Sequence, residues 1–368
     1  MRTATIGEVS IQYPDEIGFA FNPCLVIAET EDGIDLMRLE ITDGEETITE
    51  QRDGFGEKCY IDFREYVQGF FDTNEFGELE YTEVEKTKLG KSVSVQIAIT
   101  DKNELATNFS FDVFYIWGAL RAGGQEKYNG YRTMTWFVGY PFSVGVYANA
   151  ATSVLLSRDK VANKILEIPG QGVWNVRIDD ELAKRYIKVS DVEGELRETT
   201  FDESFDLTFR MSLQGTLTEK VRVNVVRCDV SDGVYLRWVD RQGFFQYYLF
   251  EQGNETRKVT NEGEFLRNNL LAYDMTYGFT GGNGRQQTKG REDTIQICAP
   301  MIDEDTFESL FDLTTSPLVD MYLGTDEYDK PRWLSVNIQA GNYTKEKGKS
   351  LRDFMCNVVM PDMTIQKL

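Results

Sequence analysis

Carboxylates are the most abundant side chains in this sequence that could do chemistry. The chain of 368 residues contains 61 aspartates and glutamates, with clusters at 179–181, 202–206 and 303–305. Oxygen ligands of this kind bind calcium, but no cluster has the spaced D-x-[DN]-x-[DN]-G pattern of a calcium loop. A pair of carboxylates could also serve a glycosidase, yet no neighbour marks one as having a raised pKa. We therefore expect surface or helix-start charge, with no metal site and no catalytic residue.

Histidine is absent, which removes the commonest general base and the commonest metal ligand. Ser-His and Cys-His triads and mixed Cys/His zinc sites cannot form. The Gly-rich segment 281–290 does not match a phosphate-binding loop and is predicted to be a flexible loop, so no cofactor is expected. The cysteines have no C-x-x-C spacing, and we expect buried free thiols rather than disulfides. They are Cys24, Cys59, Cys228, Cys298 and Cys356.

Composition limits the partners and the number of domains. The formal net charge of -22 repels DNA and anionic lipid surfaces, so neither nucleic acid nor membrane insertion is expected. The N-terminal residues lack the apolar core of a signal peptide, and no apolar run is long enough to span a bilayer, which predicts folding in a cytoplasm. A chain of this length with 41% hydrophobic residues suits two or three globular domains.

Short alternating strands dominate the elements that would position any site. The fold class we predict is mainly β, with tandem β-sandwich-like domains and few short helices. The predicted domains are residues 1–115, 116–226 and 227–368, the last with an aromatic hairpin and a helix at 303–313 capped by Asp303. Another short helix is predicted at 179–186. Three polar segments, 72–91, 121–132 and 278–293, are predicted to be loops, and 72–91 is either a protruding loop or a loose hairpin.

The aromatic hairpin is the most distinctive element. Two strand-like runs within 233–250 flank Asp240-Arg241-Gln242-Gly243, where Gly243 supplies the positive φ of a hairpin turn. Alternation places apolar side chains on both faces. Most of these residues are expected to lie in a core, with a subunit interface as the next interpretation and a sugar-stacking platform as the third. The candidate binding residues are Tyr235, Arg237, Trp238, Phe244, Tyr247 and Tyr248.

Several segments carry a resemblance to one class of proteins. They are Val234–Gly243 with the aromatic run to Phe250, Trp117–Leu120, Thr135–Phe142, Leu313–Val319 and Trp333–Ile338. The Tyr-x-Arg-Trp and Asp-x-x-Gly pattern of the hairpin resembles structural proteins of tailed bacteriophages that infect Bacteroides-like gut bacteria. The segments after residue 312 are similar to the closing module of phage tail-tip proteins.

This resemblance implies a non-enzymatic virion protein, a tail-tip, baseplate or distal-tail component that assembles into a ring. Its partners would be other tail proteins and copies of itself, contacted through the loops 72–91, 121–132 and 278–293, with host surface glycan as a further contact. It would reach the virion after assembly in the host cytoplasm. The alternative is a carbohydrate-binding module or adhesin that stacks sugars on exposed Tyr and Trp. A glycan-cleaving enzyme is the third hypothesis.

Overall fold

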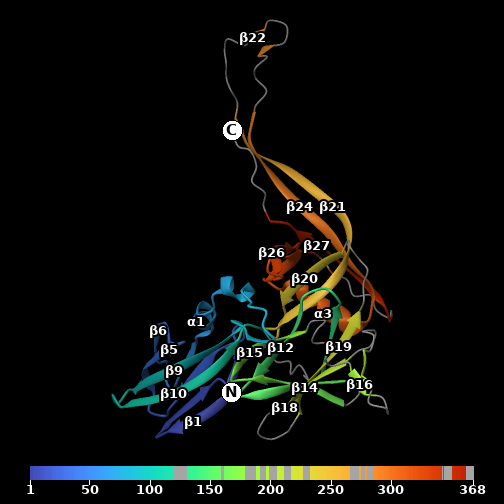
Figure 1. Ribbon diagram of the computed structural model, residues 1–368. Helices are drawn as coiled ribbons and strands as arrows, with labels where there is room; N and C mark the ends of the chain where they lie inside the picture. Colours follow the sequence, from blue (N-terminus) through green and yellow to red (C-terminus); the bar gives the residue numbers. More distant parts are fainter. Residues whose placement is uncertain are drawn as a thin grey trace. The chain divides into compact units, whose positions relative to one another are not determined.

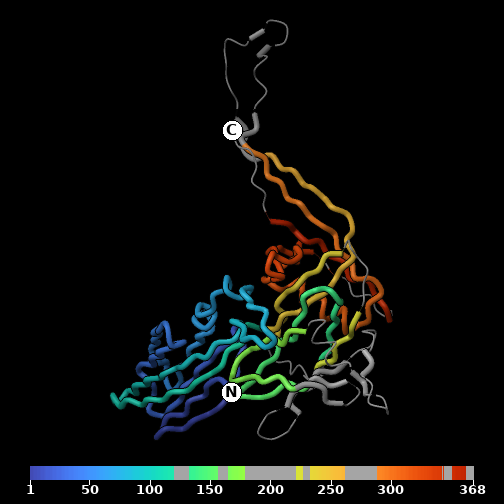
Figure 2. The backbone as a smooth tube through the Cα atoms, in the orientation of Figure 1, coloured from blue at the N-terminus to red at the C-terminus, as the bar shows by residue number. Residues whose placement is uncertain are grey.

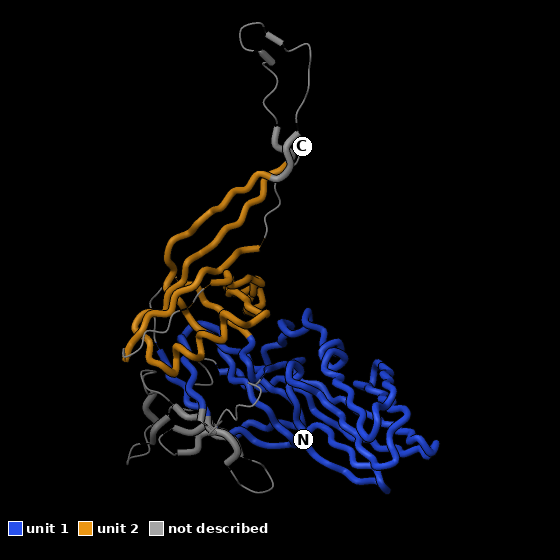
Figure 3. The backbone as a smooth tube through the Cα atoms, turned by 180° about the vertical axis from the view of Figure 1, so that it is seen from behind, with its two compact units in different colours: residues 1–228, 239–247 blue, residues 229–238, 248–368 orange. Residues whose placement is uncertain are grey.

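The chain is mainly β and sandwich-like, as the sequence predicts, and it divides into two compact units. Unit 1 comprises residues 1–228 and 239–247, and unit 2 comprises residues 229–238 and 248–368 (Figure 3). The division of the first 226 residues near position 115 stays a prediction. The computed structural model describes residues 1–119, 131–158, 161–178, 188–190, 196–198, 205–210, 217–226, 233–265, 273–274, 278–279, 285–341, 343 and 350–361.

Two sheets form the first part of unit 1 (Figure 1). Their strand orders are β1-β2-β4-β7 and β3-β10-β9-β5-β6. Strict alternation buries Leu39, Ile41 and Val95 while the polar residues between them face outward. The strands are β1 (Arg2–Ile6), β2 (Val9–Tyr13), β3 (Ile17–Phe19), β4 (Leu25–Glu29), β5 (Ile34–Thr42), β6 (Thr47–Asp53), β7 (Lys58–Asp62), β9 (Gly90–Asp101) and β10 (Ala106–Ile116).

Two further sheets complete unit 1, with orders β11-β19-β18-β13-β14 and β12-β15-β8. Strands β16 (Lys188–Ser190) and β17 (Leu196–Glu198) form a separate pair. The predicted helix at 179–186 lies outside the described residues. The main strands are β8 (Val84–Lys86), β11 (Tyr131–Phe137), β12 (Phe142–Ala148), β13 (Thr152–Arg158), β14 (Val161–Ile168), β15 (Gly172–Ile178), β18 (Phe205–Arg210) and β19 (Leu217–Val226).

The prediction of a protruding loop or loose hairpin at 72–91 is only partly right: residues 78–83 form neither helix nor strand, but the segments on both sides of them do. The short helix α1 (Arg64–Gly69) leads into a 3-10 helix η1 (Thr73–Gly77), and β8 then pairs antiparallel with β15. Phe76 packs edge-on against Trp117, and Leu89 is fully buried. These apolar residues are too widely spaced to show a period in the sequence. The segment is therefore part of the packed structure of unit 1.

Unit 2 is built around a closed barrel with the order β20-β21-β24-β27-β26-β25. Apolar side chains of alternate strand positions fill it, among them Leu236, Phe250, Ile297 and Val358. Strands β22 (Tyr273–Asp274) and β23 (Gly278–Phe279) form a small separate pair. The barrel elements are β20 (Gly233–Val239), β21 (Phe245–Phe265), β24 (Arg285–Ile302), helix α3 (Glu304–Thr315), β25 (Val319–Thr325), β26 (Pro331–Ile338) and β27 (Arg352–Val359).

Helix α3 begins where the sequence predicts it. The Asp303 carboxylate accepts a hydrogen bond from the Thr306 backbone N–H at 2.8 Å, which is an N-cap. Phe307, Leu310 and Leu313 are buried on one face of the helix, whereas Phe311 is exposed. The helix thus covers the barrel core with a face centred between residues 307 and 313.

Strands β21 and β24 continue past the barrel as a two-stranded ribbon, here called the arm (Figure 2). The arm comprises the paired segments 257–265 and 285–293. Strand β27 accompanies β24 only up to Thr294, which pairs with Val359. Residues 285–293 were predicted to be a loop because they are polar and contain glycine, but pairing with β21 makes them a strand. Most of the other predicted contact loop, 121–132, lies outside the described residues.

Three hairpins turn with the same arrangement around an aspartate. The side-chain oxygens of Asp101, Asp240 and Asp326 each accept backbone N–H bonds from the second and fourth following residues, at 2.8–2.9 Å. The third following residue has a positive φ in each case: 60° for Glu104, 80° for Gly243 and 58° for Asp329. Only the aromatic hairpin has glycine at that position, which confirms the predicted turn.

Replacing Glu104 by glycine should stabilise the protein by about 1 kcal/mol, because the left-handed conformation strains a residue with a Cβ. Gly243→Ala should instead destabilise it by about 2 kcal/mol, since a Cβ at this site would meet Ile116 and the Trp117 carbonyl. Denaturant midpoints measure both effects. Glu104→Ala is the matched control and should change little; equal stabilisation by the alanine and glycine variants would contradict the account.

Candidate functional site

Four of the six candidate residues of the hairpin are buried, and Phe244 and Tyr248 are half-buried, which confirms the core interpretation for most of them. Trp238 belongs to the apolar core of the barrel, and Tyr235 and Arg237 are buried on the opposite face of β20. Tyr248 packs against the same core, and burial raises its pKa to about 12. These four residues belong to unit 2, whereas Phe244 and Tyr247 belong to unit 1. No single open site contains all six residues.

Arg237 is held by an ion pair on the outer side of the barrel strands. Its Nε lies 2.9 Å from Asp320 Oδ2, and its guanidinium lies 4.3 Å from the ring centroid of Trp333. Asp320 occupies the position on β25 directly opposite Arg237. The guanidinium is 2% exposed, so the pair neutralises a charge that water does not reach. This is a structural arrangement rather than a ligand site.

The tip of the hairpin is equally well packed within unit 1. The hydroxyls of Tyr247 and Ser143 lie 2.7 Å apart, and the Arg132 guanidinium lies 4.8 Å from the Phe244 ring centroid. Asp240 Oδ2 accepts a hydrogen bond from Gln246 Nε2 at 2.7 Å. Burial raises the pKa of the Asp240 carboxyl, although Arg132 and the hydrogen-bond donors act in the opposite direction. The polar groups at the tip thus stabilise the turn.

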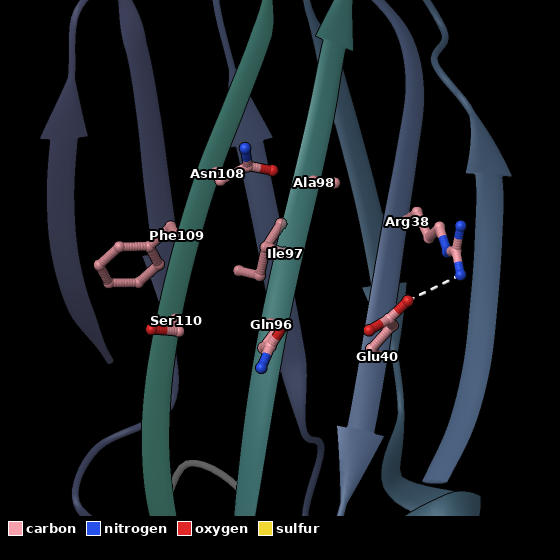
Figure 4. A pocket seen from close by; sticks show the side chains of 8 residues that line it. All are labelled: Arg38, Glu40, Gln96, Ile97, Ala98, Asn108, Phe109 and Ser110. Carbon is pink, nitrogen blue, oxygen red and sulfur yellow. Dashed lines mark hydrogen bonds and ion pairs between the residues drawn. The ribbon is translucent and has the colours of Figure 1, made fainter.

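An open polar hollow on the outward face of the five-stranded sheet of unit 1 is the candidate binding site (Figure 4). Its volume is about 690 Å³, and three adjacent strands, β5, β9 and β10, supply all of its lining. The lining consists mainly of polar side chains around one alanine: Arg38, Glu40, Gln96, Ile97, Ala98, Asn108, Phe109 and Ser110. None of these residues was singled out as a site residue from the sequence.

Strand register arranges this lining in two rows. Ala98 lies opposite Arg38 on one side and Asn108 on the other. The next row contains Gln96, which lies between Glu40 and Ser110. Directly opposed residues in antiparallel strands share a face, so the polar side chains of both rows project from the same side of the sheet. Because the Ala98 side chain is shorter than its neighbours, the surface of the sheet is hollow at this position.

The hollow contains one charged pair and three uncharged hydrogen-bonding side chains. Arg38 Nη2 donates to Glu40 Oε1 at 2.7 Å, and both side chains are about half exposed. The side chains of Gln96, Asn108 and Ser110 make no hydrogen bond to the described part of the protein. Because Glu40 is the only carboxylate in the lining and is paired, this arrangement suits binding better than acid–base chemistry.

Other kinds of site have little support in the described part of the chain. No group of three Cys, Asp or Glu residues there is placed to hold a metal ion. No helix among the described residues has the length and apolar character needed to cross a membrane. The four described cysteines carry free thiols, and burial raises the pKa of Cys24 to about 11 and that of Cys356 to about 12. These two buried thiols are therefore poor nucleophiles near neutral pH.

Comparisons with known proteins give no family. No family model matches the sequence, and no curated protein matches it. Among solved structures, the periplasmic chaperone SfaE aligns at 13% identity and a TM-score of 0.22, over 59% of this chain and 100% of the chaperone. Dimeric latent PorU from Porphyromonas gingivalis aligns at 8% identity and a TM-score of 0.17, over 78% of this chain and 32% of PorU. Similarities this low carry no argument about function.

Asp320→Ala should destabilise the protein by about 3 kcal/mol, because it removes the carboxylate that lies 2.9 Å from the buried Arg237 Nε. The double variant Arg237→Met/Asp320→Leu removes both charges and should recover most of that loss. Chemical denaturation of the three proteins measures the difference. A single variant as stable as the parent, or a double variant no better than the single one, would contradict the structural role of the pair.

Proposed function

We propose that this chain is a non-enzymatic structural protein of a bacteriophage tail tip or baseplate that assembles with copies of itself. The observation that carries the assembly role is the arm of unit 2, whose two strands leave the barrel with no third strand beside them among the described residues. The virion setting comes from the resemblance of the hairpin and of the segments after residue 312 to tail proteins. The two arguments are independent.

The arm exposes backbone groups that have no partner in the described protein. Along β21 every residue from Glu251 to Asn261 is exposed. Beyond Thr294, β24 has only β21 as a neighbour among the described strands, and β21 has only β24. Two-stranded hairpins are marginally stable in water, and a free strand edge is a template for pairing with another chain. Assembly would supply the missing neighbours.

The side chains of the arm suit a contact between identical copies. Its two paired segments contain five basic and four acidic residues, so it is nearly neutral in a chain with a net charge of -22. Lys258 lies 3.8 Å from Glu292 on the opposing strand, and Arg257 lies opposite Asp293. An edge of one arm placed in the same register beside the opposite edge of the next copy would repeat these complementary pairs. Copies could therefore meet at their arms without the repulsion that their acidic remainder creates.

The alternative function, sugar stacking on the aromatic hairpin, loses its structural basis. Trp238 is 1% exposed and Tyr235 is equally buried, so neither presents a ring face to a ligand. The glycosidase hypothesis gains no support from the hollow, which lacks a second carboxylate.

Removing the arm should abolish self-assembly. Deleting residues 258–292 and joining Arg257 to Asp293 through Asn-Gly keeps an opposed strand pair and gives it a tight turn. We expect concentration-dependent oligomers of the parent protein in mass photometry and only monomers of the variant. The barrel core lies outside the deleted residues, so both proteins should show the same denaturation midpoint within about 1 kcal/mol.

Tyr328→Ala serves as the control, because Tyr328 is an exposed aromatic residue at the tip of another hairpin of unit 2, between β25 and β26. This variant should assemble like the parent. A parent protein that stays monomeric at all concentrations and does not join virions would contradict the proposed function. Oligomers that survive the deletion would show that assembly uses another surface.

A further inference from the structure

The hollow on the five-stranded sheet has a local cause that distinguishes it from an ordinary solvated sheet face. Ala98 occupies the central outward position between the longer side chains of Arg38 and Asn108. All the side chains around it stand on β5, β9 and β10, which pair antiparallel with one another, and this pairing fixes their spacing. The volume of about 690 Å³ falls within the usual range for small-ligand sites, roughly 300–1,000 Å³. The short side chain of Ala98 therefore creates the hollow, and the paired strands fix the positions of the side chains around it (Figure 4).

From this geometry we propose that the hollow binds a neutral polyhydroxylated ligand, namely a segment of an uncharged sugar chain. Gln96 and Asn108 each offer an amide donor and an amide acceptor, and Ser110 offers a hydroxyl that can do both. Adjacent sugar hydroxyls likewise donate and accept together. The three side chains make no hydrogen bond within the described protein, so binding does not require any of them to break one.

Charge distinguishes neutral ligands from anionic ones. The Arg38 guanidinium is the only cation of the lining, and Glu40 already neutralises it at 2.7 Å. An anionic ligand would have to compete with Glu40 and approach a chain with a net charge of -22. A neutral ligand meets neither obstacle and can still accept hydrogen bonds from the exposed part of the guanidinium. Sulfated and sialylated glycans are therefore expected to bind less well than neutral ones.

The test uses the full chain, produced in bacteria, on an array of neutral, sulfated and sialylated glycans. We expect selective binding of at least one neutral oligosaccharide, with its affinity then measured by titration calorimetry. The double variant Gln96→Ala/Asn108→Ala should weaken that binding about tenfold or more, since it removes two amides that contact the ligand. Ala98→Leu, which fills the depression but keeps every polar group, should weaken it to a similar extent.

Ser92→Ala is the matched control, because Ser92 lies on the same strand and the same outward face but outside the hollow. It should bind like the parent. Failure of every neutral glycan to bind, preference for anionic glycans, or full affinity of the double variant would each overturn the proposal. The variant without the arm should keep its glycan affinity, so the loss of assembly and the loss of sugar binding can be told apart.

Discussion

The turn of the aromatic hairpin contains a buried carboxylate and backbone N–H groups, and both need hydrogen-bond partners. Asp240 meets both needs by accepting hydrogen bonds from the N–H groups of Gln242 and Phe244 and from the Gln246 amide. The strands that this turn joins contribute Leu236 and Phe250 to the barrel of unit 2, while the turn itself belongs to unit 1. These hydrogen bonds of Asp240 therefore hold the turn of a hairpin whose residues are divided between the two units.

Backbone pairing distinguishes the barrel, in which every strand has two neighbours, from the arm, in which each strand has one neighbour among the described residues. Closure of the barrel gives each of its six strands two neighbours, which removes exposed edges. The arm is the continuation of two of those strands beyond the point where their outer neighbours end. Most of its residues are polar, and its basic and acidic residues nearly balance; none of its described residues belongs to the apolar core of the barrel. The assembly role that we propose is based on this lack of neighbouring strands among the described residues rather than on any single residue.

The sequence predicted the features that depend on neighbouring residues. The alternation of apolar and polar residues predicted the β class. Gly243 predicted the hairpin turn, and Asp303 predicted the start of α3. The sequence did not predict features that depend on pairing between strands far apart in the chain. Polar composition made 285–293 look like a loop, and the hollow arises only when β5, β9 and β10 align Arg38, Ala98 and Asn108. The resemblance to tail proteins concerns function and stays a prediction.

Amide hydrogen exchange of the arm, compared between dilute and concentrated protein, tests the central claim most directly. If free strand edges drive assembly, amides of residues 256–261 and 288–293 should gain protection as concentration rises, while those of the barrel strands stay unchanged. The gain should follow the mass of the particles measured in the same samples. Oligomers that form while the exchange of these arm amides remains as fast as in the monomer would contradict the claim.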